Sequence, residues 1–291
     1  MNSQKLISYE WAIAIYKGDS PFNLKPIKDR PEAFITFQNV SDVAANFVAD
    51  PFMIFKDGLW YMFFEVLNRS TGLGEIGYAI SNDAVHWDYK NIILRQDSHL
   101  SYPFIFKNED AIYMIPETRQ AGEIRLYRAS SFPDKWEQVK VMLKGNYADT
   151  TITKHKDRWW MFTLKGTKNL DLYYSDSIFG KWLPHANNPV IENDLKISRP
   201  AGGMIKYKDK LYRLAQDGVP LYGNKVRAFE VIEMDEDQYV EREIEESPIL
   251  MATRKGWNSI GMHHIDAHQI NDSYWIACVD GAKPKLKNLN R

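Results

Sequence analysis

One pattern recurs five times along the chain and constrains the fold more than any other feature of the sequence. Each copy is an apolar strand, a polar turn and a second apolar strand centred on an aromatic residue. The copies cover residues 49–65, 101–117, 148–164, 201–216 and 263–279. Their central aromatics, spaced 52, 47, 52 and 63 residues apart, are Tyr61, Tyr113, Trp160, Tyr212 and Trp275. Such a recurrence is typical of proteins that repeat one supersecondary unit.

The first four copies are followed by further strand patterns. A third alternating strand covers residues 76–87, 124–136, 170–182 and 226–239, and a fourth follows it, as at 91–94 and 139–143. Four strands in each unit, repeated radially, are the pattern of a β-propeller, and no segment has a sustained helical period. We therefore predict an all-β, five-bladed β-propeller that forms a single domain over residues 1–291. A β-sandwich is the alternative, but it leaves the repeat unexplained.

The fifth blade needs a strand from elsewhere, because only polar sequence follows Val279. Residues 9–22 have the pattern of a third strand, with Ile13 and Ile15 ahead of a Gly-Asp-Ser turn. A strand from the N-terminus would complete this sheet and remove an exposed edge. The predicted blades lie near 45–95, 98–143, 146–192 and 198–250, and near 258–280 together with 8–18.

Charge and cysteine content exclude several classes of protein. Lys plus Arg number 37 and Asp plus Glu number 38, so the net charge is −1. This balance argues against a general nucleic-acid or anionic-membrane binder. Cys278 is the only cysteine, so no internal disulfide and no cysteine-based zinc site are expected. No secretory signal pattern and no membrane-spanning stretch are present, so we expect a cytoplasmic protein.

The repeat also predicts which polar side chains converge. Equivalent positions in a propeller lie on one ring around its central channel. Asp50 opens the first strand of the first copy, and its counterparts are Tyr102, Asp149, Ala201 and His264. Glu65 ends the second strand, and its counterparts include Glu117 and Gln216. Because hairpin strands are antiparallel, both sets should lie at the same rim, with Arg199 and Lys165 nearby, and we expect the acids in the largest concave pocket.

Carboxyl groups gathered in this way suit acid–base chemistry on a sugar. That chemistry needs one carboxylate as base or nucleophile and one carboxylic acid of raised pKa to protonate the leaving oxygen. Structural alternatives remain at this point: Asp50 before a proline could simply cap a turn, and Glu65 could form an ion pair with Arg199. No metal site is predicted and no cofactor is required, because His263 and His264 would point to opposite faces of a strand. His264 is the candidate to face the channel and hold a cation or a water there.

Five short segments carry a resemblance to a known family. The chain resembles the five-bladed β-propeller glycosidases, which include glycoside hydrolase families 43, 32, 62 and 130. The segments ADPF, PET, ADTT, SRPAGG and HHID bring it closest to the glycosidase-like N-terminal domain of glucosamine inositolphosphorylceramide transferase. The resemblance implies that Asp50 is the base or nucleophile and that Asp149 orients the substrate. Family 43 takes its acid from a later blade, so Glu117 is our substitute for that residue.

The sequence therefore predicts an enzyme that acts on a glycosidic bond by carboxylate acid–base catalysis, in glycan synthesis or remodelling. The catalytic candidates are Asp50, Glu117 and Asp149, and the substrate-binding candidates are Glu65, Tyr102, Lys165, Arg199, Gln216 and His264. The expected ligand is a carbohydrate or glycoconjugate, and the expected partners are enzymes of glycan biosynthesis. A non-catalytic carbohydrate-binding propeller and a sugar-transferring enzyme are the alternatives.

Overall fold

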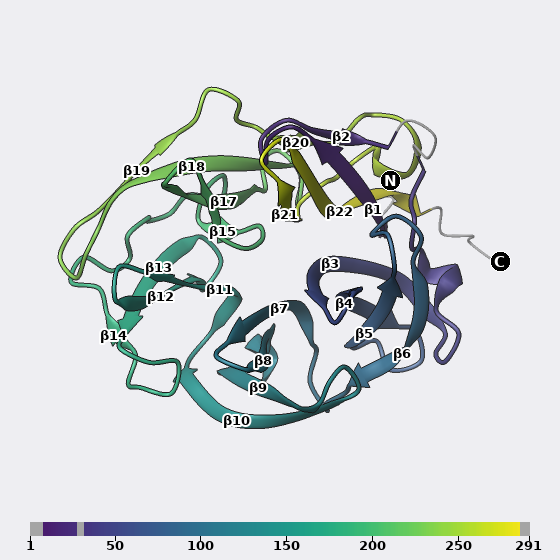
Figure 1. Cartoon of the computed structure of the whole chain (residues 1–291), viewed down its shortest axis with the longest axis horizontal. Helices are drawn as coiled ribbons and strands as arrows, with labels where there is room; N and C mark the ends of the chain where they lie inside the picture. The colour runs from purple at the N-terminus through teal and green to yellow at the C-terminus, as the bar shows by residue number, and fades with distance from the viewer. Residues whose placement is uncertain (1–7, 28–31, 286–291) are drawn as a thin grey trace, which may run out of the picture.

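The computed structural model of the chain describes residues 8–27 and 32–285, and its strands form five sheets around one axis (Figure 1). The first sheet, blade 1, contains β3 (Ala45–Lys56), β4 (Leu59–Asn68), β5 (Gly74–Ser81) and β6 (Asp88–Leu94). Blade 2 contains β7 (Ser101–Asn108), β8 (Ala111–Glu117), β9 (Glu123–Ser131) and β10 (Lys135–Lys144). Blade 3 contains β11 (Tyr147–His155), β12 (Arg158–Lys165), β13 (Asn169–Ser175) and β14 (Leu183–Pro184).

The last two sheets depart from four consecutive strands. Blade 4 has six, namely β15 (Arg199–Pro200), β16 (Ile205–Tyr207), β17 (Lys210–Asp217), β18 (Lys225–Met234), β19 (Tyr239–Glu243) and β20 (Leu250–Met251). Blade 5 is built from both ends of the described chain, in the order β2 (Leu24–Pro26), β1 (Ser8–Gly18), β22 (Tyr274–Lys285) and β21 (Ile265–Asn271). In the described residues the helical segments are three short 3₁₀ turns, Phe37–Asn39, Arg119–Ala121 and Gly256–Asn258, and no helix has the length and apolarity needed to cross a membrane.

The predicted all-β propeller of five blades is confirmed, and so is the completion of the last blade by the N-terminal strand. β1 pairs antiparallel with β22 from Ser8 opposite Lys285 to Gly18 opposite Trp275. The prediction stopped at residue 18, whereas the structure adds β2 as the outermost strand of this sheet. The blade therefore has no missing strand, and the ring closes through hydrogen bonds between the two ends of the described chain.

The aromatic residue at the centre of each repeat packs between neighbouring blades. Tyr113 joins an apolar cluster shared by blades 1, 2 and 3, and Trp160 joins one between blades 3 and 4. Tyr212 and Trp275 both lie in the cluster between blades 4 and 5. Burying a large aromatic side chain is worth about 1.5–3 kcal/mol, so these residues hold the sheets together rather than form a ligand surface.

Three inner strands share a bulge at the same repeat position. The register of each hairpin shifts between Ala49 and Phe52 in blade 1, and at the corresponding points of blades 2 and 3. At the bulge the backbone is left-handed, with φ of 52° at Asp50, 44° at Tyr102 and 48° at Asp149. Residues other than glycine rarely adopt this conformation, which costs about 1–3 kcal/mol and tends to occur at functional sites. The bulges therefore mark one mouth of the channel.

Candidate active site at one mouth of the channel

A cavity of about 190 Å³ opens beside these bulges. Its lining includes four of the predicted site residues, Asp50, Glu65, Glu117 and Arg199. They come from β3, β4, β8 and β15, so blades 1, 2 and 4 all contribute. Asp149, on β11 of blade 3, lies directly behind and is bound to Arg199. The structure thus brings the three predicted catalytic acids together.

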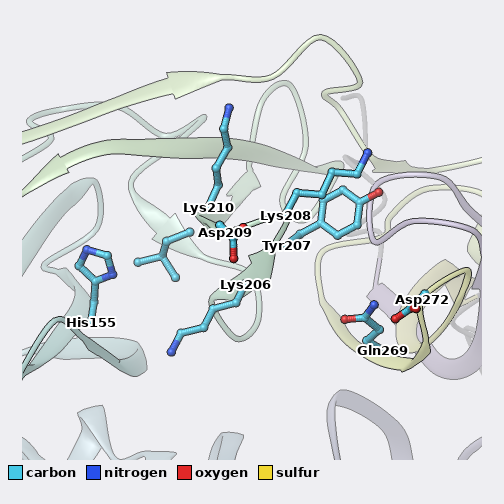
Figure 2. Close-up of a pocket in the computed structure, with 9 residues that line it drawn as sticks. His155, Lys206, Tyr207, Lys208, Asp209, Lys210, Gln269 and Asp272 are labelled. Atoms are coloured by element: carbon cyan, nitrogen blue, oxygen red, sulfur yellow. The ribbon is translucent and has the colours of Figure 1, made fainter.

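The expectation that the acids lie in the largest concave pocket was wrong. A cavity of about 440 Å³ lies at the other end of β11 and is lined by His155, Lys206, Lys208 and Lys210 (Figure 2). The three lysine side chains point apart in Figure 2. Lys210 is bound to Glu230 at 2.9 Å, and the ammonium of Lys208 lies 5.0 Å from the centre of the Tyr207 ring. The propeller therefore carries its smaller, acid-lined cavity at the opposite rim.

Arg199 connects two of the acids. Its Nε and Nη2 both donate to the carboxylate of Asp149, the second at 3.3 Å from Oδ1. The same Nη2 lies 3.8 Å from Oε2 of Glu117. Burial raises the pKa of Asp149, but the charge and hydrogen bonds of Arg199 outweigh burial and hold that pKa below its ordinary value. Asp149 is therefore the ionised partner, and the alternative pairing of Glu65 with Arg199 was wrong.

Glu117 has the opposite electrostatic character. Burial raises the pKa of its carboxyl group well above the ordinary value, and the negative charge of Asp149 raises it further against the opposing charge of Arg199. Within the described residues its Oε2 makes no hydrogen bond. A carboxyl group whose pKa is raised in this way and that faces a cavity can act as a general acid. Glu117 and Asp149 are thus neighbouring carboxyl groups whose pKa values are pushed apart.

Asp50 belongs to a second hydrogen-bonded group with His263 and Asp280. The carboxylate of Asp280 accepts the backbone N–H of Asp50 at 3.2 Å and Nδ1–H of His263 at 2.8 Å. It also accepts the backbone N–H groups of His263 and His264. The remaining ring nitrogen of His263, Nε2, lies 3.8 Å from Oδ1 of Asp50. Burial raises the pKa of Asp50 well above its ordinary value; the charge of His263 opposes this rise only in part, and the charge of Asp149 adds to it.

Asp50, His263 and Asp280 are residue types that bind metal ions, but several of their ligand atoms already take part in hydrogen bonds. Ligand atoms of Asp50, His263 and Asp280 lie within 4.8 Å of one another. The Asp280 oxygens, however, already accept four N–H groups, and one ring nitrogen of His263 is used in the same way. A zinc ion in proteins takes three or more ligands from the chain, and only two side chains here keep a free donor. The arrangement fits a relay between Asp280, His263 and Asp50 better than an ion site.

The other predicted ligand-binding residues are placed differently. The hydroxyl of Tyr102 is buried and bound to Thr151 and to the backbone of Gly202, so its hydrogen-bonding capacity is used. His264 lies behind the lining, where its Nε2 is 2.9 Å from the carbonyl oxygen of Pro51. Burial lowers the pKa of the His264 ring to about 4.

Lys165, Glu65 and Gln216 complete the predicted set. Half-exposed Lys165 is bound to Asp171 at 3.1 Å. Glu65 faces the cavity and lies 3.2 Å from Nε2 of His99. Gln216 lines a separate, smaller cavity with Arg199.

Sequence reasoning missed several residues that line or support the cavity. These are Trp11, His99, Tyr222, His263 and Asp280. Trp11 stacks on His263, with ring centres 4.0 Å apart and an interplanar angle of 15°. Tyr222 comes from the loop between β17 and β18, and its ring centre lies 5.3 Å from the Arg199 guanidinium. The available signals were the first histidine of HHID and the buried-strand position of Asp280 directly after the fifth repeat.

Solved structures share this fold at low sequence identity. A putative glycoside hydrolase from Parabacteroides distasonis superposes with a TM-score of 0.60 and 13% identity, over 80% of this chain and 86% of that one. The catalytic domain of the Coprinopsis cinerea GH62 alpha-L-arabinofuranosidase gives a TM-score of 0.62 and 11% identity, over 95% of this chain and 98% of that one. At these identities the likeness concerns the fold alone.

Sequence relatives are much closer. Glucosamine inositolphosphorylceramide transferase 1 of Arabidopsis thaliana is 36% identical over 298 residues, which cover 93% of this chain and 39% of the relative. Its counterpart in Oryza sativa subsp. japonica is 34% identical over 297 residues, with 93% and 40% covered. The chain thus spans about two fifths of the length of these relatives. The family model described as Glucosamine inositolphosphorylceramide transferase 1, N-terminal, matches residues 7–282, and the chain belongs to that family.

Proposed function

We propose that this propeller binds a carbohydrate or glycoconjugate in the 190 Å³ cavity and acts on a glycosidic bond by carboxylate acid–base catalysis. One observation carries the proposal. Glu117 and Asp149 meet at Arg199 with pKa values displaced in opposite directions, and Asp50 lines the same cavity. Paired carboxyl groups of unlike protonation are what glycosidic bond cleavage or transfer requires.

Each acid takes one role in the proposed reaction. Glu117 donates its proton to the leaving oxygen. Asp50 acts as the base toward an attacking hydroxyl group, or as the nucleophile. Asp149 stays ionised against Arg199, orients that guanidinium at the cavity and keeps the pKa of Glu117 high through its charge. As proposed, the chemistry uses side chains of this chain and needs no cofactor.

His263 supports the ionised form of Asp50 in this scheme. Asp280 fixes the proton on Nδ1 of His263 and so directs Nε2 toward Asp50. A positive imidazolium at 3.8 Å favours the carboxylate of Asp50 against the effect of its burial. Trp11 holds the plane of the ring by stacking. His263 and Asp280 are therefore positioning residues for the base.

The attacking group distinguishes hydrolysis from transfer. The relatives are named as transferases, and this chain matches about two fifths of their length. That name supports a sugar-transferring reaction, or a role in glycan synthesis or remodelling beside other enzymes of that process. A propeller that binds sugar without turnover is the second candidate, favoured by the absence of a glutamate on blade 4 at positions 199, 201 and 216.

The test uses purified full-length chain, a panel of aryl glycosides and disaccharides, and chromatographic detection of released or transferred sugar. Glu117→Gln and Asp50→Asn should each lower turnover roughly 10²- to 10⁴-fold, the usual contribution of a general acid or base. Glu137→Gln, on the exposed outer strand β10, is the matched control and should leave turnover unchanged. Sugar binding without turnover would favour the binding propeller, and neither binding nor turnover on any panel member would overturn the proposal.

A further inference from the structure

A second cavity lies directly beside the first. It has a volume of about 130 Å³ and is lined by Arg199 and Tyr222, which also line the 190 Å³ cavity. The remaining lining comes from blade 3 and the loops around it, including Leu164 and Leu195, and from Gln216 on β17. Two cavities that share two side chains form one site with two compartments, separated by the Arg199–Tyr222 wall.

Gln216 gives the second compartment its chemistry. β17 places Gln216 opposite Arg199 in the sheet, and only 4% of the surface of Gln216 is exposed. Its amide makes no hydrogen bond to any other residue of the part of the chain that the structure describes, yet it lines the cavity. The amide atoms keep some accessible surface toward the cavity, so they are open to a ligand. A ligand with hydroxyl groups could both donate to the amide oxygen and accept from its N–H groups.

The rest of the lining is unsuited to an anion. The charge of Arg199 is directed to Asp149 and Glu117, and Asp194 adds a carboxylate to the wall. Leu164 and Leu195 supply apolar surface, as the faces of a sugar ring require. The backbone N–H of Gly218 donates to the carbonyl of Leu195 at 3.0 Å, which joins the loop after β17 to the segment between blades 3 and 4.

The general acid of the proposed function stands at the boundary between the compartments. Oε2 of Glu117 lies 3.8 Å from Nη2 of Arg199, and Arg199 is part of the shared wall. A proton donor has to reach the oxygen that joins the two halves of a substrate. The bridging oxygen would therefore lie at the Arg199–Tyr222 wall, with one half of the substrate in each compartment.

We propose that the 130 Å³ cavity is the subsite for the second half of the substrate, and that this half is an uncharged, hydroxyl-bearing ring held by Gln216. The inference rests on the proposed function and deepens it. It assigns the larger compartment, beside Asp50, to the unit whose anomeric carbon reacts. It assigns the smaller compartment to the leaving or accepting unit.

The experiment measures binding by titration calorimetry with glucose, mannose, galactose and glucosamine, and with the homodisaccharides of each. The wild-type chain should bind the disaccharides of its preferred sugar more tightly than the monosaccharide. Gln216→Met keeps the side-chain length and removes both hydrogen-bonding groups. It should weaken disaccharide binding about 2- to 10-fold, the equivalent of one neutral hydrogen bond, and leave monosaccharide binding unchanged. Gln138→Met, on the exposed face of β10, is the matched control and should change neither affinity.

The failures of the two proposals differ in this experiment. Monosaccharide binding without any gain for disaccharides overturns the second subsite and leaves the proposed function standing. Equal weakening of both ligands by Gln216→Met also overturns it, because Gln216 would then belong to the first compartment. If none of the sugars binds, both proposals are overturned.

Discussion

The carboxylate of Asp280 holds the ring of His263 through a hydrogen bond of 2.8 Å from Nδ1. The same carboxylate binds the backbone N–H of Asp50, whose φ of 52° is unfavourable for an aspartate. One buried side chain therefore fixes both the ring that faces Asp50 and the backbone that presents Asp50. This relationship makes the geometry of the candidate base depend on a residue that does not line the cavity.

Replacing Asp280 should loosen both contacts. Burial lowers the pKa of His263, but the charge and hydrogen bond of Asp280 outweigh it and raise that pKa above its ordinary value. In Asp280→Asn the pKa of His263 should fall, and stability should drop by about 1.5–3 kcal/mol because hydrogen bonds to a charged acceptor are lost. NMR titration of the imidazole and urea denaturation measure the two effects. An unchanged His263 titration would contradict the relay.

The ion pair of Asp149 with Arg199 predicts a stability effect at low pH. The folded-state pKa of Asp149 is lowered, so its contribution to stability is present above the ordinary value of 3.8 and is lost as pH falls through the lower folded value. Asp149→Asn leaves Arg199 without its buried partner and should destabilise the protein by about 3–5 kcal/mol at pH 7. The difference between the two proteins should shrink below pH 4, which denaturation curves across pH would show. A difference independent of pH would argue against an ionised Asp149.

Glu117 should act on stability in the opposite sense. Its folded-state pKa is raised, so its favourable contribution is present below the ordinary value of 4.5 and is lost as pH rises through the folded value. Glu117→Gln keeps the shape and stays neutral, so the variant should gain stability relative to wild type as pH rises above 4.5. Thermal unfolding of both proteins between pH 4 and pH 9 tests this sign. A constant difference over that range would mean that Glu117 is ionised throughout and is no proton donor.

Tyr222 should matter for ligand binding rather than for folding. Its side chain is 43% exposed, while its ring contacts Arg199 and stands edge-on to Trp11. Tyr222→Ala should weaken sugar binding about 2- to 10-fold, since aromatic contacts are worth about 0.5–1.5 kcal/mol, with little change in Tm. Tyr222→Phe keeps the ring and should bind nearly as well. Phe179→Ala, an exposed aromatic on another surface, is the control, and equal effects of Tyr222→Ala and Phe179→Ala on binding would exclude a specific contact.

The sequence was sufficient to predict what the repeat governs. Asp50 and Asp149 share a repeat position. The repeat therefore predicts that both begin an inner strand and lie at the same rim of the channel. Glu117 follows because it ends the strand that returns to the same rim. The bulges at these positions were not predicted, because the repeat does not report the contacts between blades that accompany two of them: Asp50 N–H binds Asp280, and the Asp149 side chain binds Arg199.

The interpretation failed where residues leave the regular strands. His263 and His264 precede β21, and both of their N–H groups bind Asp280, so strand alternation does not apply to them. His263 consequently lines the cavity and His264 is buried. Tyr222 and His99 lie in loops that differ between the blades, and a repeat carries no information about such segments. Tyr102 has the predicted position, but its hydroxyl turns to Gly202 across the channel.

The pairing of β1 with β22 sets the order in which the site can form. Ser8 and Lys285 are joined by a hydrogen bond across 277 positions, the kind of remote contact that forms late because a long loop must close first. During translation β1 has no partner at its inner edge until β22, which ends at Lys285, has been made. Trp11, on β1, reaches His263 only when β1 pairs with β22. A nascent chain can therefore assemble blades 1 to 4 while the acid-lined cavity still lacks the wall that Trp11 supplies, and β22, the last strand of the described residues, completes it.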